Sequence, residues 1–436
     1  MFSLGGKTGS RYLGLALAAL LVCAATAGAQ ESGGDWGVTL DSDATLRLVN
    51  DWAERDTAYV VSSAFWSRYF VPLRGDGGLE LAADLSYTWS DDRPYLFDVN
   101  TLRSRGTFPA ALGAGSQLQA TAGRFRFTEP TGAVLNHTAD GAELRLSFSR
   151  VRLTLASGYT GLQLGPNSDI RVSAADSQDL SDDDEFFGPA RAFGMLTLTV
   201  PQIFQRHTAR VSVVGQRDLR DEVHGTDPGE DIYHSGYYSL LLEGPVVPSL
   251  FYDVFTTVST GVLELGDLTE NTMGLLVSGR LRLFRPDMSF SRASLRLQYA
   301  SGPGDTWDTF VPVVRANAGT VLGLPLQNMI VSELRYSLRP FSTSRSAAMR
   351  NLQTGIAARN FFTATEELPA TAGVKLNNAG RWLGNEVVLN LAGRIFVDLG
   401  FALTGGVFIP ETGSYGVFSG ERRTEFYAKA EISSAL

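Results

Sequence analysis

The chain is poor in cysteine, lysine and histidine, and it has no long apolar run after its first thirty residues. It contains one cysteine (Cys23), three lysines and four histidines. No later window approaches the roughly 18 consecutive apolar residues that indicate a membrane-crossing helix. If Cys23 is removed with a leader, the remaining chain has no thiol. This excludes disulfides, cysteine metal sites and thiol catalysis.

The N-terminus has the features of a secretory leader. Lys7 and Arg11 supply a positive start, and residues 13–25 form an apolar run. A small-x-small cleavage signal follows and ends at Ala29. We therefore expect residues 1–29 to be a signal peptide that is cleaved near Ala29 during export.

The other possible fate of this segment is lipidation at Cys23. Val22 is a poor residue in front of a lipidated cysteine, and Cys23 lies deep inside the apolar run. Cleavage after Ala29 also changes the net charge from −9 to −11, because Lys7 and Arg11 are lost. An acidic chain without a basic block excludes nucleic acid as an expected partner.

The remaining residues, 30–436, alternate apolar and polar side chains with a period of two. In one segment Leu81, Ala83, Leu85, Tyr87 and Trp89 alternate with small or acidic residues. This period places the two sets on opposite faces of a β-strand. A soluble β-sandwich also alternates, but its strands are usually about 5–6 residues long. Alternation over about 10 residues favours tilted transmembrane strands.

The number and spacing of these segments predict a single all-β domain, a transmembrane antiparallel β-barrel. About eighteen segments fit, and 16 remain possible because residues 94–108 and 373–377 are ambiguous. The longest connections each follow an odd-numbered segment, so they lie on one side: 163–190, 219–232, 302–327, 363–381 and 410–422. This pattern is typical of short periplasmic turns and long external loops in the bacterial outer membrane. The expected partners are membrane lipid and, during biogenesis, the barrel-assembly machinery.

Arginine is abundant on the polar side of these strands. A barrel of this size is too wide for side chains to fill, so a lumen is expected. The arginines best placed to line it are Arg47, Arg145, Arg210, Arg280, Arg282, Arg296, Arg335, Arg339, Arg359 and Arg394. Guanidinium groups bind carboxylates and phosphates, so these residues predict a path for small anionic or sugar-like solutes. The structural alternative is that arginine–acid pairs only brace the wall.

Arg124 and Arg126 do not fit the same alternation. If both face the lumen, Phe125 and Phe127 must face lipid. The upstream strand pattern then requires a β-bulge near Gly123.

Two clusters of polar residues raise the question of metal binding or catalysis. One is an acidic run whose weak candidate ligands for Ca²⁺ are Asp182, Asp183, Asp184 and Glu185. It lacks the glycine and the terminal glutamate of a calcium loop, so a solvated loop is favoured. The other surrounds His224 and His234, without a serine and an acid at a catalytic spacing. Phosphate-binding and dinucleotide-binding glycine motifs are absent. We therefore expect no cofactor and no enzymatic activity.

Two segments resemble the alginate-export family of outer-membrane porins. In residues 123–144, a Gly123-Arg124 strand is followed by a short loop and by Asp140-Gly141. In residues 381–410, a strand with the motif Leu383-Gly384-x-Glu386 precedes a strand that ends in an aromatic residue and proline. The resemblance covers about 50 residues. It implies an eighteen-stranded barrel with an arginine-lined lumen that passes an anionic polysaccharide or a related solute.

The chain departs from this family in two respects. Lysine is nearly absent, and the C-terminus ends in Ala435-Leu436 rather than in an aromatic residue. The sequence thus favours a porin for anionic solutes. A surface adhesin that uses acidic external loops is the alternative, and a barrel hydrolase built around His224 or His234 is a weaker one. The apolar content of residues 302–327 also suggests a loop that folds inward as a constriction.

Overall fold

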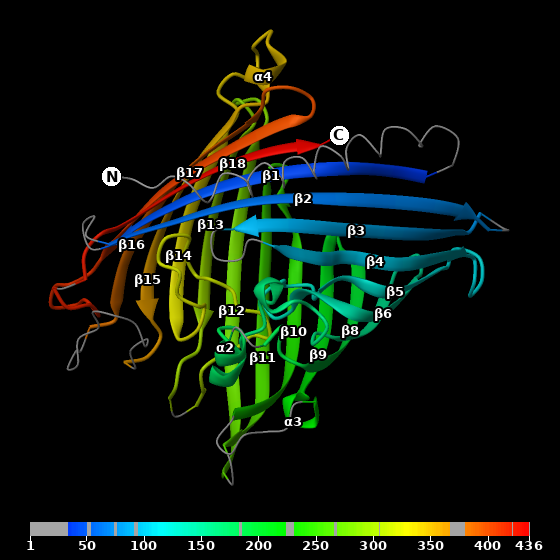
Figure 1. The fold of residues 1–436 in the computed structure, drawn as a ribbon, viewed down its shortest axis with the longest axis horizontal. Helices are drawn as coiled ribbons and strands as arrows, with labels where there is room; N and C mark the ends of the chain where they lie inside the picture. Colours follow the sequence, from blue (N-terminus) through cyan, green and yellow to red (C-terminus); the bar gives the residue numbers. More distant parts are fainter. Residues whose placement is uncertain are drawn as a thin grey trace, which may run out of the picture.

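The chain forms a closed barrel of eighteen antiparallel strands (Figure 1). The structure is a computed structural model and describes residues 34–49, 54–73, 76–90, 95–182, 185–223, 231–265, 268–304, 306–366, 380–420 and 422–435. The expected signal peptide therefore lies outside the described residues. The first nine strands are β1 (Gly34–Val49), β2 (Glu54–Pro72), β3 (Gly78–Ser90), β4 (Leu96–Pro109), β5 (Gln117–Thr128), β6 (Asn136–Ser147), β7 (Arg152–Tyr159), β8 (Arg191–Phe204) and β9 (His207–Asp218). The others are β10 (Asp231–Val247), β11 (Leu250–Leu265), β12 (Leu268–Arg285), β13 (Ser291–Ala300), β14 (Met329–Leu338), β15 (Gln353–Thr363), β16 (Trp382–Arg394), β17 (Leu399–Pro410) and β18 (Glu425–Ala435).

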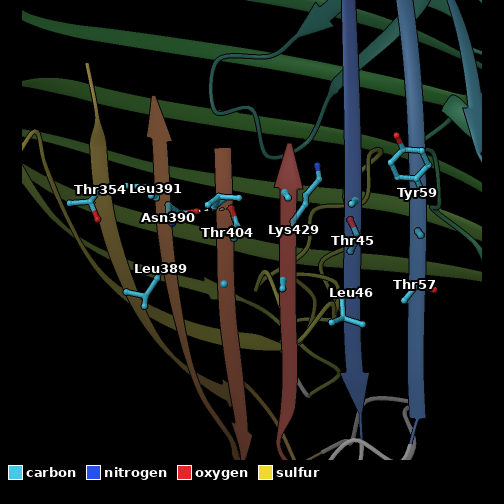
Figure 2. Close-up of a pocket in the computed structure, with 16 residues that line it drawn as sticks. Thr45, Leu46, Thr57, Tyr59, Thr354, Leu389, Asn390, Leu391, Thr404 and Lys429 are labelled. Atoms are coloured by element: carbon cyan, nitrogen blue, oxygen red, sulfur yellow. Dashed lines mark hydrogen bonds between the residues drawn. The ribbon is translucent and has the colours of Figure 1, made fainter. Parts of the chain in front are cut away.

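The barrel closes where the first strand meets the last. Each strand pairs with its neighbour in sequence, and β18 pairs with β1 from Leu48–Phe426 to Thr39–Ala435. Figure 2 shows this seam, where Thr404 of β17, Lys429 of β18 and Thr45 of β1 lie on adjacent strands. Closure leaves no strand with an unpaired edge. The prediction of eighteen strands is confirmed. The ambiguous segment 94–108 contains β4, which pairs on both sides, whereas 373–377 lies outside the described residues.

The outer wall of the barrel is apolar, as the alternation predicted. Leu81, Leu102 and Leu155 are 44%, 60% and 54% exposed, and they share one face with similar residues around the barrel. Burying such a face requires an apolar surrounding, because exposed patches of this extent are rare on soluble proteins. Among the described residues, no helix is both long enough and apolar enough to cross a bilayer.

The long and short connections separate to opposite ends of the barrel. Those after β7, β9, β13, β15 and β17 are long and define the long-loop end. Most even-numbered connections are tight turns and define the short-turn end. The exception is the β14–β15 connection, which carries the short helix α4 (Ala347–Arg350). In Figure 1, α4 lies at the end opposite α3 (Arg220–Val223), which belongs to the β9–β10 loop. The predicted separation of long loops from turns is confirmed.

Two long loops fold against the inner wall and build a core inside the barrel. They are the β7–β8 loop, with the helices η1 (Gly165–Asn167) and α2 (Ala174–Asp179), and the β13–β14 loop. Ile170 of the first pairs with Val314 of the second, and the Val314 amide donates to the carbonyl of Val134. The apolar side chains of both loops are buried with inward residues of the wall. The expectation that residues 302–327 fold inward is therefore confirmed.

Phe125 and Phe127 face this inner core. They are 5% and 1% exposed, and the Phe127 ring lies 5.0 Å from that of Phe193. The pairing of β5 with β4 and β6 has no register shift, so the β-bulge considered near Gly123 does not form. Gly123 instead has a φ of +116°, where a Cβ would meet the Leu102 carbonyl oxygen at 2.1 Å. The alternation of polar and apolar residues does not identify the inner face of β5, because the inward loops cover this part of the wall with apolar side chains.

Candidate solute path

The inner wall formed by β12 to β15 carries six arginines, which we call the arginine wall. It comprises Arg280, Arg282, Arg292, Arg296, Arg335 and Arg359. The strand register aligns them in rows, with Arg280 opposite Arg296, Arg296 opposite Glu333, and Glu333 opposite Arg359. Directly opposed like charges are unfavourable on a sheet. The rows therefore depend on interleaved carboxylates.

Two carboxylates hold most of the arginine wall in place. Asp253 lies 2.9 Å from Arg280 and 3.3 Å from Arg282. Glu333 contacts Arg296, Arg335 and Arg359 at 3.1, 3.2 and 2.6 Å. Because single carboxylates serve several guanidinium groups, the positive charge is only partly neutralised.

The guanidinium groups remain accessible from the lumen. The side chains of Arg282 and Arg335 are 47% and 52% exposed, whereas Arg359 is 9% exposed. Counting Asp253, Glu333 and Glu386 against the six arginines leaves a local charge of 6 − 3 = +3. A positive surface with free donors attracts anions and can bind a carboxylate bidentately.

A chamber of about 790 Å³ lies against the arginine wall. Four arginines of the arginine wall line the chamber. Thr320 of the inward loop also lines it, together with Asn390 of β16, Thr404 of β17 and Tyr427 of β18. The cavity therefore combines cationic donors with hydroxyl and amide groups. Its size is within the roughly 300–1,000 Å³ range of small-molecule sites.

The inward β13–β14 loop is fixed to the wall beside this chamber by Glu386. This carboxylate is fully buried and accepts hydrogen bonds from the backbone amides of Thr320, Val321 and Leu322 at 3.0, 2.7 and 3.0 Å. Arg359 also donates to it. Arg47, from β1, donates to the Val321 carbonyl at 2.7 Å. The loop is thus held from two strands that are far apart in the sequence.

Removing this anchor should loosen the loop. We expect Glu386→Ala to weaken loop docking by about 1.5–3 kcal/mol, the worth of hydrogen bonds to a charged group. Protease cleavage within residues 301–328 of the folded barrel, read by mass spectrometry, measures the effect. Glu386→Gln is the matched control because it retains one acceptor oxygen. Equal resistance of Glu386→Ala and the unmodified chain would show that the anchor is not needed.

The remaining predicted lumen arginines are dispersed. Arg145 pairs with Glu143 at 3.0 Å, and Arg210 pairs with Glu243 at 2.6 Å. Arg339 lies one residue beyond β14, in the turn, and Arg394 ends β16. Both line a hollow of about 820 Å³ at the short-turn end that also contains the acids Asp41, Asp43 and Glu431.

Sequence reasoning missed Arg292, which belongs to the arginine wall, and Arg103 and Arg105 of β4. Arg292 follows a turn directly and stacks over the Phe284 ring at 5.2 Å. Arg103 pairs with Glu80 at 3.0 Å, and Arg105 donates to Thr121 at 3.4 Å. Their spacing of two residues was a usable signal. The ambiguous assignment of residues 94–108 obscured it.

A second group of charges is buried under the β7–β8 loop. Arg191 and Asp176 are 1% and 0% exposed, and Asp176 and Asp218 both lie 2.8 Å from Arg191. Asp176 also caps its own helix by accepting from the Ser173 amide. Arg220 adds a contact of 2.8 Å to Asp218. Asp176 and Asp218, which lie close in sequence to the two polar clusters considered for metal binding or catalysis, are therefore structural partners of arginine.

Arg220 illustrates the electrostatic balance of this group. Burial alone would lower its pKa. The hydrogen bond to Asp218 and the charges of Asp176, Asp218 and Asp179 outweigh that effect and raise the pKa above its ordinary value. The group is therefore a compensated ion network rather than a cluster of free carboxylates.

The acidic run and the two histidines were the sequence candidates for a metal site and for a hydrolase. Asp182 and Glu185 are exposed, whereas Asp183 and Asp184 lie outside the described residues. In the part of the chain that the structure describes, no group of three or more His, Cys, Asp and Glu residues could hold a metal ion. His224 lies outside the described residues. His234 accepts a hydrogen bond from the Asp218 amide through Nδ1 at 3.1 Å.

Comparison with known proteins identifies similar folds but no sequence family. No protein-family model and no curated protein sequence matches the chain. Among solved structures of Pseudomonas aeruginosa proteins, OpdO is 14% identical with a TM-score of 0.58, covering 92% of this chain and 97% of its own. OpdL is 14% identical with a TM-score of 0.57, covering 92% and 98%. OccK2 (OpdF) in complex with glucuronate is 13% identical with a TM-score of 0.56, covering 92% and 96%. This likeness supports the eighteen-stranded barrel and does not single out the alginate-export type.

Proposed function

We propose that the protein is a channel of the bacterial outer membrane that passes small anionic solutes. The observation that carries this proposal is the arginine wall, with its excess positive charge, beside a chamber inside a closed barrel. A closed barrel satisfies all backbone hydrogen bonds within the sheet, as a hydrocarbon surrounding demands. The apolar outer wall fits that surrounding.

The orientation follows from the connections. Bacterial barrels place short turns in the periplasm and long loops outside, so the long-loop end is external. Export requires a leader, and residues 1–29 supply one that is cleaved near Ala29. Membrane lipid and the barrel-assembly machinery are the corresponding partners.

The solutes we infer are small carboxylates that also carry hydroxyl groups, such as uronates or short acidic sugars. Exposed Arg282 and Arg335 can bind a carboxylate. Thr320, Asn390 and Tyr427 offer hydrogen bonds to hydroxyl groups in the same chamber. The presence of glucuronate in the OccK2 structure, which has the same fold, is consistent with this class.

Passage depends on binding that is favourable but exchangeable. Asp253 and Glu333 already occupy part of each guanidinium, so an entering carboxylate competes with them instead of meeting an unpaired cation. The several arginines in register then offer successive positions along the wall. Multiple sites of moderate strength are what conduction requires.

The test is single-channel recording from the refolded mature chain in a planar bilayer with a KCl gradient. We expect discrete conductance steps and a reversal potential on the anion side. D-glucuronate should interrupt the current in a concentration-dependent manner, whereas glucose should have a much weaker effect. A correctly folded but silent barrel would overturn the channel proposal and favour the adhesin, with its external loops as the working surface.

A further inference from the structure

The two inward loops carry arginines that are separate from the arginine wall. Arg171 belongs to the β7–β8 loop and Arg315 to the β13–β14 loop. Ile170 and Val314, one residue before each, form an isolated β-bridge, and the Arg315 amide donates to the Asp169 carbonyl at 3.0 Å. The bridge therefore fixes the two arginines beside each other from loops that are far apart in the sequence.

The side chains of Arg171 and Arg315 carry uncompensated charge. Both are exposed, and in the described part of the chain neither forms an ion pair with a carboxylate within 4.0 Å. Arg315 donates a single side-chain hydrogen bond, to the Gly323 carbonyl at 3.2 Å. Partial burial and the neighbouring charge of Arg171 lower the pKa of Arg315. The single hydrogen bond leaves most donors of the Arg315 guanidinium unused.

Arg47 brings a third guanidinium to the same place. A Cβ on Gly323 would lie 3.5 Å from Nη2 of Arg47, so Arg47 and Arg315 border the same residue. Gly323 has a φ of +65°, which favours glycine, and it has no side chain to cover the Arg47 guanidinium. Arg47 is 38% exposed and contacts Glu425 at 3.3 Å.

We propose that Arg171 and Arg315 of the inward loops and Arg47 of β1 form an oxyanion-binding site, where a carboxylate-bearing solute docks before it reaches the arginine wall. This inference rests on the proposed channel function. Three guanidinium groups, of which only Arg47 forms an ion pair among the described residues, attract an anion and offer it planar donors. Because two of its three arginines belong to loops that narrow the lumen, the site acts on the rate of entry more than on the strength of binding in the chamber.

Two members of this site, Arg171 and Arg315, are separate from the braces of the barrel, whereas Arg47 also holds the loop through the Val321 carbonyl. The backbone of the β13–β14 loop is held by Glu386, whereas, among the residues that the structure describes, the side chains of Arg171 and Arg315 bond to no inward residue of a wall strand. Replacing the two loop arginines should therefore change charge without releasing the loop. Protease resistance of residues 301–328 checks this point.

The experiment compares Arg171→Gln/Arg315→Gln with the unmodified channel, using D-glucuronate as the probe. We expect the association rate of current interruptions to fall about tenfold, with little change in their duration, as expected for loss of electrostatic steering. The matched control is Arg217→Gln/Arg381→Gln. It removes the same charge from exposed pairs with Glu222 and Glu366.

The outcomes distinguish this inference from the channel proposal. A glucuronate association rate within twofold of the unmodified channel overturns the loop site, even if conductance and anion preference persist. An equal fall in the control variant also overturns it, because any external charge would then suffice. A silent unmodified chain overturns the channel proposal itself.

Discussion

Replacing Arg282, Arg296 and Arg335 together with serine should remove the anion preference of the channel. The arginine wall holds six guanidinium groups beside the carboxylates of Asp253, Glu333 and Glu386. The triple variant keeps three guanidinium groups and the same three carboxylates. The local charge therefore falls from +3 to zero, while Glu333 keeps only Arg359. Rings of charged side chains set the ion preference of pores, so the effect should be large.

The measurement is the reversal potential under a tenfold KCl gradient. We expect a shift toward the cation side by a substantial fraction of the ~59 mV that a tenfold ratio gives for a monovalent ion. The control replaces Arg217, Arg285 and Arg381 with serine. These exposed arginines pair with acids outside the arginine wall. An unchanged potential in the wall variant would mean that these arginines only brace the barrel.

Replacing Arg191 with alanine should cause the largest loss of stability. Asp176 and Asp218 are both buried, and Arg191 contacts each of them at 2.8 Å. Without it, the two carboxylates share Arg220, which lies 3.7 Å from Asp176 and 2.8 Å from Asp218. Breaking a buried pair by removing one partner costs about 3–5 kcal/mol, because an uncompensated charge remains.

Denaturant unfolding in lipid, together with protease cleavage within residues 160–190, measures this effect. We expect a lower denaturation midpoint and faster cleavage, because Asp176 lies in α2 and its contact with Arg191 connects the β7–β8 loop to the wall. Arg217→Ala is the control, since its pair with Glu222 is exposed and contributes about 0–1 kcal/mol. A loss in Arg191→Ala no greater than in this control would show that water or repacking compensates the carboxylates.

The sequence by itself determined the closed barrel. Alternation over long strands fixes which side chains face outward, and the lengths of the connections fix the two ends. The structure confirms eighteen strands with these connections, apart from the longer β14–β15 turn. Alternation also predicted that Arg282, Arg296, Arg335 and Arg359 share one inner face, and the cross-strand register brings these four residues to the same face of the sheet. These features are local or periodic, so a single strand carries the signal.

Tertiary structure alone decided how the lumen is filled. A period of two shows that Phe127 and Thr128 face opposite ways, but not which loop covers Phe127 or that the inner wall becomes apolar there. Likewise, the sequence shows Asp176 within an acidic run. Its burial against Arg191 depends on where α2 docks. Contacts between segments that are distant along the chain depend on the path of the long loops through the barrel. Loop paths have no periodicity from which they can be predicted, so the positions of Arg171 and Arg315 become visible only in the folded chain.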